Sequence, residues 1–271
     1  MKKLIKKIVQ FILLLFLVGF IIDIVIKNPM NNKLLEYQIT KLDKAKNIDI
    51  ALIGDSSLGN GIQAKFFYKN TYNFALTGDY NLINNYRMLE KIIKSNPELR
   101  KVYIMQTFDV YERDNSNMLN INLEQENLFL RIFVKIKSLK YYLTVKPFDN
   151  SRINYELDYM SQSENIYDFK NKKRVLTKNI SSDNKSSILS IKKLCEDNNI
   201  DYYFLFGPSI LLEKNEYYIQ LIDFFKTNQI QFKKDYFVLN EQNIGDAIDH
   251  VSSLYKEEST KFYYDLVNRK D

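Results

Sequence analysis

The sequence predicts an α/β fold in which helices cover both faces of a mostly parallel sheet, preceded by a membrane-spanning helix. Short apolar runs typical of buried strands alternate with stretches whose apolar residues repeat at helical spacing. This alternation is the pattern of successive βαβ units. Strands that are buried on both faces are expected to be apolar throughout, as these runs are. A long apolar stretch near the N-terminus predicts the membrane helix.

That stretch is residues 8–26, IVQFILLLFLVGFIIDIVI, in which only Gln10 and Asp23 are polar. Roughly 20 residues are needed for a helix to cross a bilayer. A cleaved signal peptide is the alternative, but it would end in small residues of the A-x-A type, and none follow the run. We therefore expect residues 1–30 to be a cytoplasmic tail and an uncleaved anchor. Lysines precede the run, although other lysines follow it. The preceding lysines favour a cytoplasmic N-terminus, so we expect residues 31–271 to form an extracytoplasmic domain attached to the membrane.

Beyond the anchor, five apolar runs are predicted to be strands and four periodic stretches to be helices. The predicted strands are residues 48–53, 71–76, 101–108, 200–209 and 235–240. The predicted helices are residues 80–95, 186–199, 216–228 and 254–268. Residues 110–182 lack this regularity, so we expect an insertion there, with an aromatic-rich helical part at 119–145.

Composition excludes several classes of function. The net charge is +6, but residues 1–30 contain five lysines and one aspartate, so residues 31–271 keep only +2. With no later cluster of Lys and Arg, nucleic-acid binding is not expected. The single cysteine, Cys195, excludes an intrachain disulfide and a Cys-based zinc site. With a single histidine as well, we expect no metal and no cofactor.

Chemically active side chains follow three of the predicted strands, and functional groups of open α/β sheets gather at the carboxyl ends of strands. Gly54-Asp55-Ser56-Ser57 follows the first strand, Gly78 follows the second, and Asp246 to His250 follow the last. A serine hydroxyl needs a neighbouring base to become a nucleophile, and histidine is the usual base near neutral pH. Ser56 and His250, the only histidine, are therefore the candidate pair.

The GDSS segment has two simpler interpretations, as a helix cap and as a phosphate-binding loop. Asp55 or Ser56 could merely cap the helix that follows the strand, since both residue types are favoured at that position. Gly54 and Gly59 also have the spacing of a phosphate-binding loop. That loop requires Lys and then Ser or Thr, whereas Asn60 and Gly61 follow here, so phosphate binding of this type is excluded.

Taken together, GDSS after the first strand, Gly78 after the second and an Asp-His motif near the C-terminus resemble the SGNH/GDSL hydrolase superfamily. The chain most resembles its membrane-anchored, extracytoplasmic members associated with acetylation of bacterial cell-surface polysaccharides. The resemblance covers about residues 48–110 and 186–268. It implies a flavodoxin-like three-layer α/β/α sandwich and ester chemistry through an acyl-serine. It also implies that Ser56 is the nucleophile, that His250 is the base, and that the N–H groups of Ser56 and Gly78 form the oxyanion hole.

The sequence departs from the family pattern at the catalytic acid. The family places this acid three residues before the histidine, where this chain has Ala247. Asp246 and Asp249 flank that position, and we prefer Asp246 as the partner of His250. In a shifted register, Asp249 would take the place of the acid and Ser252 that of the histidine, which would favour an inactive protein.

A second departure concerns the oxyanion hole. The family supplies an asparagine after the third strand, and the aligned residue here is Phe108. Gln106 or Asn81 are candidates to replace its amide. Loss of one oxyanion donor costs on the order of 10²–10³ in rate, so an unreplaced asparagine would weaken the enzyme without abolishing its mechanism.

These observations predict a serine esterase or O-acetyltransferase that acts on acyl esters of a cell-surface glycan. The transferase version implies a membrane-bound O-acyltransferase as the partner that delivers the acyl group. An inactive protein of the same fold, which binds polysaccharide or an assembly partner, is the alternative. A lipid or thioester hydrolase would use the same residues.

Overall fold

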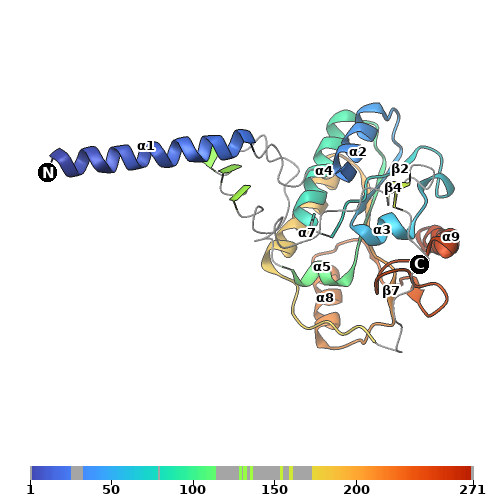
Figure 1. The fold of residues 1–271 in the computed structure, drawn as a ribbon. Helices are drawn as coiled ribbons and strands as arrows, with labels where there is room; N and C mark the ends of the chain where they lie inside the picture. The colour runs from blue at the N-terminus through green and yellow to red at the C-terminus, as the bar shows by residue number, and fades with distance from the viewer. Residues whose placement is uncertain are drawn as a thin grey trace. The chain divides into compact units, whose positions relative to one another are not determined.

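The computed structural model in Figure 1 describes residues 2–25, 33–78, 80–113 and 173–269. It also describes five short pieces at 128–129, 131–132, 135–136, 153–154 and 159–160. Most of the insertion predicted at about residues 110–182 therefore lies outside the described residues. The chain divides into two compact units. One contains residues 1–33 and 119–149, and the other contains residues 34–118 and 150–271.

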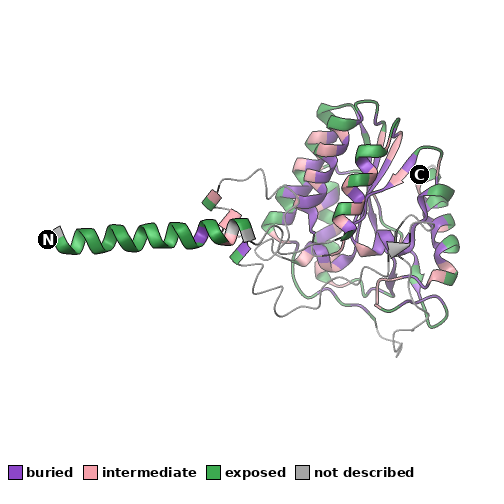
Figure 2. Ribbon diagram, turned by 45° about the horizontal axis from the view of Figure 1, so that its top comes forward, coloured by how far each residue is buried: buried purple, intermediate pink, exposed green. Residues whose placement is uncertain are grey.

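The first unit contains one long apolar helix, α1 (Lys2–Val25). The span Lys3–Ile22 has a mean hydropathy of 2.4 and is long and apolar enough to cross a membrane, although a signal sequence has the same character. Its apolar side chains are exposed along nearly the whole helix (Figure 2). The ring of Phe16 meets that of Phe129 edge to face, with centroids 5.4 Å apart. The expected apolar N-terminal helix is thus present.

The second unit is built on a five-stranded sheet whose strands all run parallel. Its strands are β1 (Ile50–Gly54), β2 (Thr71–Asn73), β3 (Lys101–Gln106), β6 (Asp201–Phe206) and β8 (Phe232–Lys233), in the order β2-β1-β3-β6-β8. The register pairs Gly54 with Met105 and Gln106 with Phe206, so the carboxyl ends of the three central strands lie side by side. The prediction of a mostly parallel sheet is confirmed.

The strand predicted at residues 235–240 forms, but it is short and lies outside the main sheet. Within residues 235–240 only β9 (Val238–Leu239) is extended, and it pairs with β7 (Ser209–Ile210) in a separate two-stranded sheet. The fifth strand of the main sheet is β8, which the sequence did not reveal because two residues carry no periodicity. A further two-stranded antiparallel sheet joins β4 (Ile153–Asn154) to β5 (Tyr159–Met160).

Helices connect the strands of the main sheet. The longer ones are α2 (Lys33–Lys44), α4 (Leu82–Ser95), α7 (Ser182–Asp197), α8 (Glu216–Thr227) and α9 (Lys256–Asn268). The shorter ones are α3 (Ser56–Gly61), α5 (Phe108–Glu112) and the 3₁₀ turns η1 (Ala64–Phe66) and η5 (Ser253–Tyr255). Asparagine and serine caps set two helix starts: Ser181 accepts a hydrogen bond from the amide of Asn184, and Asn215 accepts one from that of Tyr218.

Aromatic side chains pack on both faces of the sheet. On one face, Phe204 and Phe206 of β6 contact Phe225 of α8, with ring centroids 5.5 and 6.1 Å apart. On the other face, Tyr103 of β3 contacts Phe67, which follows η1, at 5.6 Å. Burial from both sides explains why the strands are apolar throughout. It also leaves the carboxyl ends of the strands as the place where polar side chains can gather.

Candidate active site

Ser56 is the first residue of α3, and a single residue, the helix cap Asp55, separates it from the end of β1. Oδ1 of Asp55 accepts hydrogen bonds from the amide of Ser57 at 2.9 Å and from its hydroxyl at 2.6 Å. Oδ2 accepts one from the amide of Thr107 at 2.8 Å, which ties the cap to the end of β3. The capping interpretation is therefore right for Asp55. Because Asp55 makes the cap, the hydroxyl of the partly exposed Ser56 can contact other partners.

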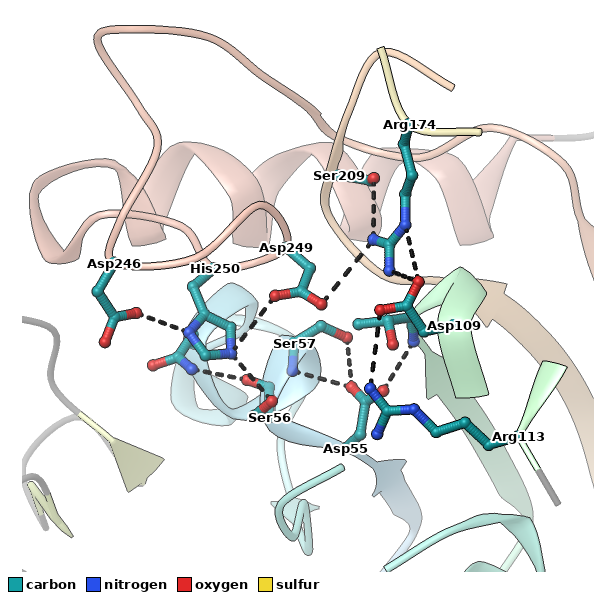
Figure 3. A network of polar contacts seen from close by, with 12 residues as sticks. Asp55, Ser56, Ser57, Asp109, Arg113, Arg174, Ser209, Asp246, Asp249 and His250 are labelled. Carbon is teal, nitrogen blue, oxygen red and sulfur yellow. Dashed lines mark hydrogen bonds and ion pairs between the residues drawn. The ribbon is translucent and has the colours of Figure 1, made fainter. Parts of the chain in front are cut away.

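Ser56, His250 and Asp246 form a chain of polar contacts (Figure 3). Oγ of Ser56 lies 2.9 Å from Nε2 of His250, although the two residues are 194 positions apart. Nδ1 of the same ring lies 2.7 Å from Oδ1 of Asp246. An ionised carboxylate can only accept, so Nδ1 carries the proton toward Asp246 and Nε2 offers its lone pair to the serine hydroxyl. This arrangement can activate the hydroxyl as a nucleophile.

A tight loop between Gly245 and His250 produces this geometry. The amide of Gly245 donates to the carbonyl of His250 at 2.6 Å, and the amide of His250 donates to the carbonyl of Ala247 at 3.2 Å. The carbonyl of Ile248 accepts from Ile210 of β7 at 3.0 Å, which anchors the loop to the small sheet. The turn brings Asp246, four residues earlier, back to the imidazole. Ala247, three residues before the histidine, takes part in this loop through its carbonyl.

Asp249 lies on the opposite side of the imidazole from Asp246. Its Oδ1 is 3.7 Å from Nε2 of His250, the nitrogen that also faces Ser56, and its Oδ2 is 3.8 Å from Nη1 of Arg174. Burial raises the pKa of Asp249, while His250 and Arg174 lower it. His250 itself, and not Ser252, contacts Ser56, so the shifted register does not describe this site.

Arg174 is a functional candidate that the sequence did not reveal. It lies in the irregular region 110–182, where no motif marks it. Its side chain is 4% exposed. Its Nε donates to Asp109 at 3.1 Å and its Nη1 donates to Ser209 at 3.3 Å, and Nη2 forms an ion pair with Asp109. An arginine in an irregular stretch of sequence is too common to be singled out as a functional residue.

The candidate oxyanion donors have different surroundings. Gly78 is partly exposed, and a Cβ at this position would meet only the guanidinium of Arg113, at 3.4 Å. Asn81 caps α4 by position and is fully buried, and its Nδ2 has no hydrogen-bond partner among the described residues. Gln106 is also fully buried, and both atoms of its amide lack a partner there. Phe108, by contrast, stacks on Phe206 in the core at 4.7 Å.

Metal or thiol chemistry finds no support in the described part of the chain. No group of three or more His, Cys, Asp or Glu side chains there could hold a metal ion. Cys195 is buried in α7, and burial raises the pKa of its thiol to about 12. A thiol with that pKa stays protonated at neutral pH and is a poor nucleophile.

Comparisons with known proteins add no family to this picture. A scan against protein-family models finds no match, and a search of curated proteins finds no significant match. The case for a function therefore depends on the side chains around Ser56. Those side chains have the composition and spacing of a serine–histidine–aspartate triad.

Proposed function

We propose that the chain is an extracytoplasmic serine esterase or O-acetyltransferase that acts on acyl esters of a cell-surface glycan. The observation that carries this proposal is the continuous contact from Asp246 through His250 to Ser56, at 2.7 and 2.9 Å. Three residues of the right types at hydrogen-bond distance, in an order that fixes the histidine tautomer, are the requirement for acyl transfer through serine.

In the proposed reaction, Nε2 of His250 takes the proton of Ser56 while Oγ attacks the acyl carbon of the ester. The tetrahedral intermediate collapses to an acyl-serine, and the imidazolium returns the proton to the departing alkoxide. Water or a sugar hydroxyl then gives a proton to His250 and attacks the acyl-serine. As the acyl–oxygen bond of this second intermediate breaks, the imidazolium returns the proton to Oγ, which releases an acid or a new ester and restores Ser56 and neutral His250. Asp246 stabilises the imidazolium that forms in both halves of the reaction.

The oxyanion of the intermediate needs hydrogen-bond donors near Ser56. We assign this role to the backbone N–H groups of Ser56 and Gly78, following the family resemblance. The open space around Gly78 is compatible with the close approach of a substrate. The amide nitrogens of Asn81 and Gln106, which have no partner among the described residues, are candidates for the additional donor, because buried polar atoms without partners are costly unless a ligand or water satisfies them.

The architecture that fits this function is the flavodoxin-like three-layer sandwich. The parallel strands have the order β2-β1-β3-β6-β8, which corresponds to the order 2-1-3-4-5 of that fold when the five strands are counted along the chain. Aromatic packing on both faces of the sheet supports the same assignment. In such folds the ligand binds beyond the carboxyl ends of the strands, where Ser56 lies.

The proposed location is the outer side of the cell membrane, with α1 as an uncleaved anchor. The hydropathy of Lys3–Ile22 supports a membrane span, and lysines 2, 3, 6 and 7 support a cytoplasmic N-terminus. A glycan at the surface is within reach of a domain tethered there. If the enzyme is a transferase, a membrane-bound O-acyltransferase would supply its acyl groups.

A non-catalytic polysaccharide-binding protein is the second candidate. Phe108 favours it, because this residue lies in the core at the place where the family has an oxyanion-hole asparagine. Labelling separates the two candidates. The full chain in detergent should react with a serine-directed phosphonate and hydrolyse p-nitrophenyl acetate, the Ser56→Ala variant should do neither, and Ser253→Ala, a partly exposed serine elsewhere, should behave as wild type. Equal turnover by wild type and Ser56→Ala would exclude the enzyme.

A further inference from the structure

Arg174 is held rigidly beside the proposed triad by both its backbone and its side chain. Its amide donates to the carbonyl of Leu211 and its carbonyl accepts from the amide of Glu213, each at 2.8 Å. The buried guanidinium contacts Asp109, Ser209 and Asp249. A buried arginine costs desolvation energy, so these partners are needed to keep it there. Nothing in the proposed reaction, however, uses it.

Asp249 belongs to a network of charged side chains next to His250. Asp246 contacts one ring nitrogen, Asp249 lies near the other, and Asp55 and Asp109 are close enough to act on the charge of Asp249. The cations in this network are Arg174 and Arg113, and Arg113 reaches Asp109 at 3.7 Å. Asp249 therefore lies between the imidazole of His250 and the guanidinium of Arg174.

Asp249 is the carboxylate that can disturb the pair of Ser56 and His250. Its Oδ1 is 3.7 Å from Nε2, so a small rotation of its side chain would bring it within hydrogen-bond distance of a protonated ring. It would then compete with Ser56 for the same nitrogen. Arg174 attracts the other carboxylate oxygen, Oδ2, from the opposite side, at 3.8 Å.

We propose that Arg174 is a positioning residue that holds Asp249 away from Nε2 of His250 and so keeps this nitrogen for the hydroxyl of Ser56. The proposal deepens the esterase or transferase assignment and rests on it. An arginine suits this role because its planar fork contacts Asp109, Ser209 and Asp249 at once, whereas a lysine would offer a single ammonium group.

The single histidine allows a direct test that needs no substrate. In full-length protein labelled with ¹³C-histidine, one imidazole signal reports the protonation of His250 as the pH is changed. Without Arg174, Asp249 is free to approach Nε2, so Arg174→Met should raise the titration midpoint of His250 above that of the wild type. Asp249→Asn should lower the midpoint, since it removes a nearby anion.

The double variant decides whether Asp249 mediates the effect. On the Asp249→Asn background, Arg174→Met should move the midpoint by less than half as much as it does on the wild-type background. Arg113→Met is the matched control, because it removes a guanidinium that contacts Asp109 instead of Asp249, and it should also move the midpoint by less than half as much. Equal shifts with and without Asp249, or no shift at all, would overturn the proposal.

Turnover of p-nitrophenyl acetate at pH 7 gives a second readout. Arg174→Met should lower it, because less His250 is then neutral and free to act as the base, and the additional Asp249→Asn change should restore most of the loss. A merely structural role for Arg174 predicts no such recovery. If Arg174→Met does not fold, Arg174→Lys keeps the buried charge, and its smaller midpoint rise should still disappear with Asp249→Asn.

The two proposals fail in distinguishable ways. Turnover that survives Ser56→Ala would remove the esterase or transferase function, while the titration of His250 would still report whether Arg174 restrains Asp249. Conversely, phosphonate labelling at Ser56 with an unchanged midpoint in Arg174→Met would leave the enzyme intact and remove the role of Arg174.

Discussion

Neighbouring residues of the same type make different contacts in this site. Asp55 and Ser57 bond to each other and form the helix cap, which leaves Ser56 to face His250. Asp246 bonds to Nδ1 of His250, whereas Asp249 faces Nε2 and Arg174. The sequence identified Ser56 and His250 because residue type and position relative to strands suffice for that. It left the acid open because the loop conformation, which sequence spacing does not determine, decides which aspartate reaches the ring.

The two aspartates beside His250 should therefore differ in their effect on catalysis. Asp246→Asn removes the acceptor that fixes the histidine tautomer, so kcat for p-nitrophenyl acetate should fall on the order of 10³-fold or more. Asp249→Asn leaves that acceptor in place and should change kcat by less than about tenfold. Steady-state kinetics at pH 7.5 on the two purified variants compares them. A larger loss with Asp249→Asn would reverse their assignment.

Asp249 should also make the thermal stability of the protein depend on pH. Burial raises its pKa in the folded state, so the folded state binds a proton more readily than the unfolded state, and ionised Asp249 costs stability above both pKa values. That cost disappears as the pH falls through the raised pKa. Asp249→Asn should thus raise the midpoint of thermal unfolding at pH 7, on the order of 2 °C, and by less at pH 4. A larger gain at pH 4 than at pH 7 would contradict this linkage.

At the scale of elements, the segment after β6 closely approaches the start of α3, where Ser56 lies. Gly207 directly follows β6 and donates its amide to the carbonyl of Gln106 at 2.9 Å. A Cβ on Gly207 would come within 2.1 Å of Oγ of Ser57 and 2.8 Å of its Cβ. The absence of a side chain at Gly207 is therefore what allows the carboxyl ends of β3 and β6 to meet the start of α3.

Gly207→Ala should accordingly destabilise the fold, by about 1–3 kcal/mol from overpacking, and misplace Ser56 as well. Chemical denaturation and phosphonate labelling would measure the two effects. Gly78→Ala serves as a control for stability, because its new Cβ would have only the guanidinium of Arg113 nearby, at 3.4 Å. If both substitutions had the same effect on the free energy of unfolding, the contact with Ser57 would not matter.

Comparison of the predicted and observed elements shows which strands and helices the sequence patterns can identify. Four of the five predicted strands lie in the main sheet or extend into it, because runs such as residues 101–108 are apolar enough to identify. The predicted helices at 80–95, 216–228 and 254–268 overlap α4, α8 and α9, and that at 186–199 overlaps α7, which begins earlier at Ser182. Two-residue strands such as β8 escape detection, since their pairing depends on neighbours distant in the chain. The same limit applies to Arg174, whose partners come from three other segments.

At the scale of the whole molecule, the two units differ in how much apolar surface they expose. The second unit buries its apolar side chains around the sheet, whereas α1 exposes apolar side chains at most of its positions. An exposed apolar surface of that extent is not stable in water and requires a membrane or a partner. The charge of residues 1–30 agrees with a membrane whose inner surface is negative.

Fractionation of cells that express the full chain should test the anchor. We expect the protein in the membrane fraction after carbonate extraction, with the intact mass of 32.3 kDa, because no small-residue cleavage site follows the apolar run. Removal of residues 1–32 should release a water-soluble protein that still reacts with the phosphonate. A shortened protein in the soluble fraction of the full-length culture would instead identify a cleaved signal peptide.

The separation of 194 residues between Ser56 and His250 has a consequence for the life of the chain. Ser56 is synthesised before His250, so a chain that still lacks the segment of His250 holds this serine without its proposed base. A break anywhere between them, or loss of the final 22 residues, uncouples the pair in the same way once the pieces part. If the proposed function is right, activity would therefore require that both segments are present and folded together.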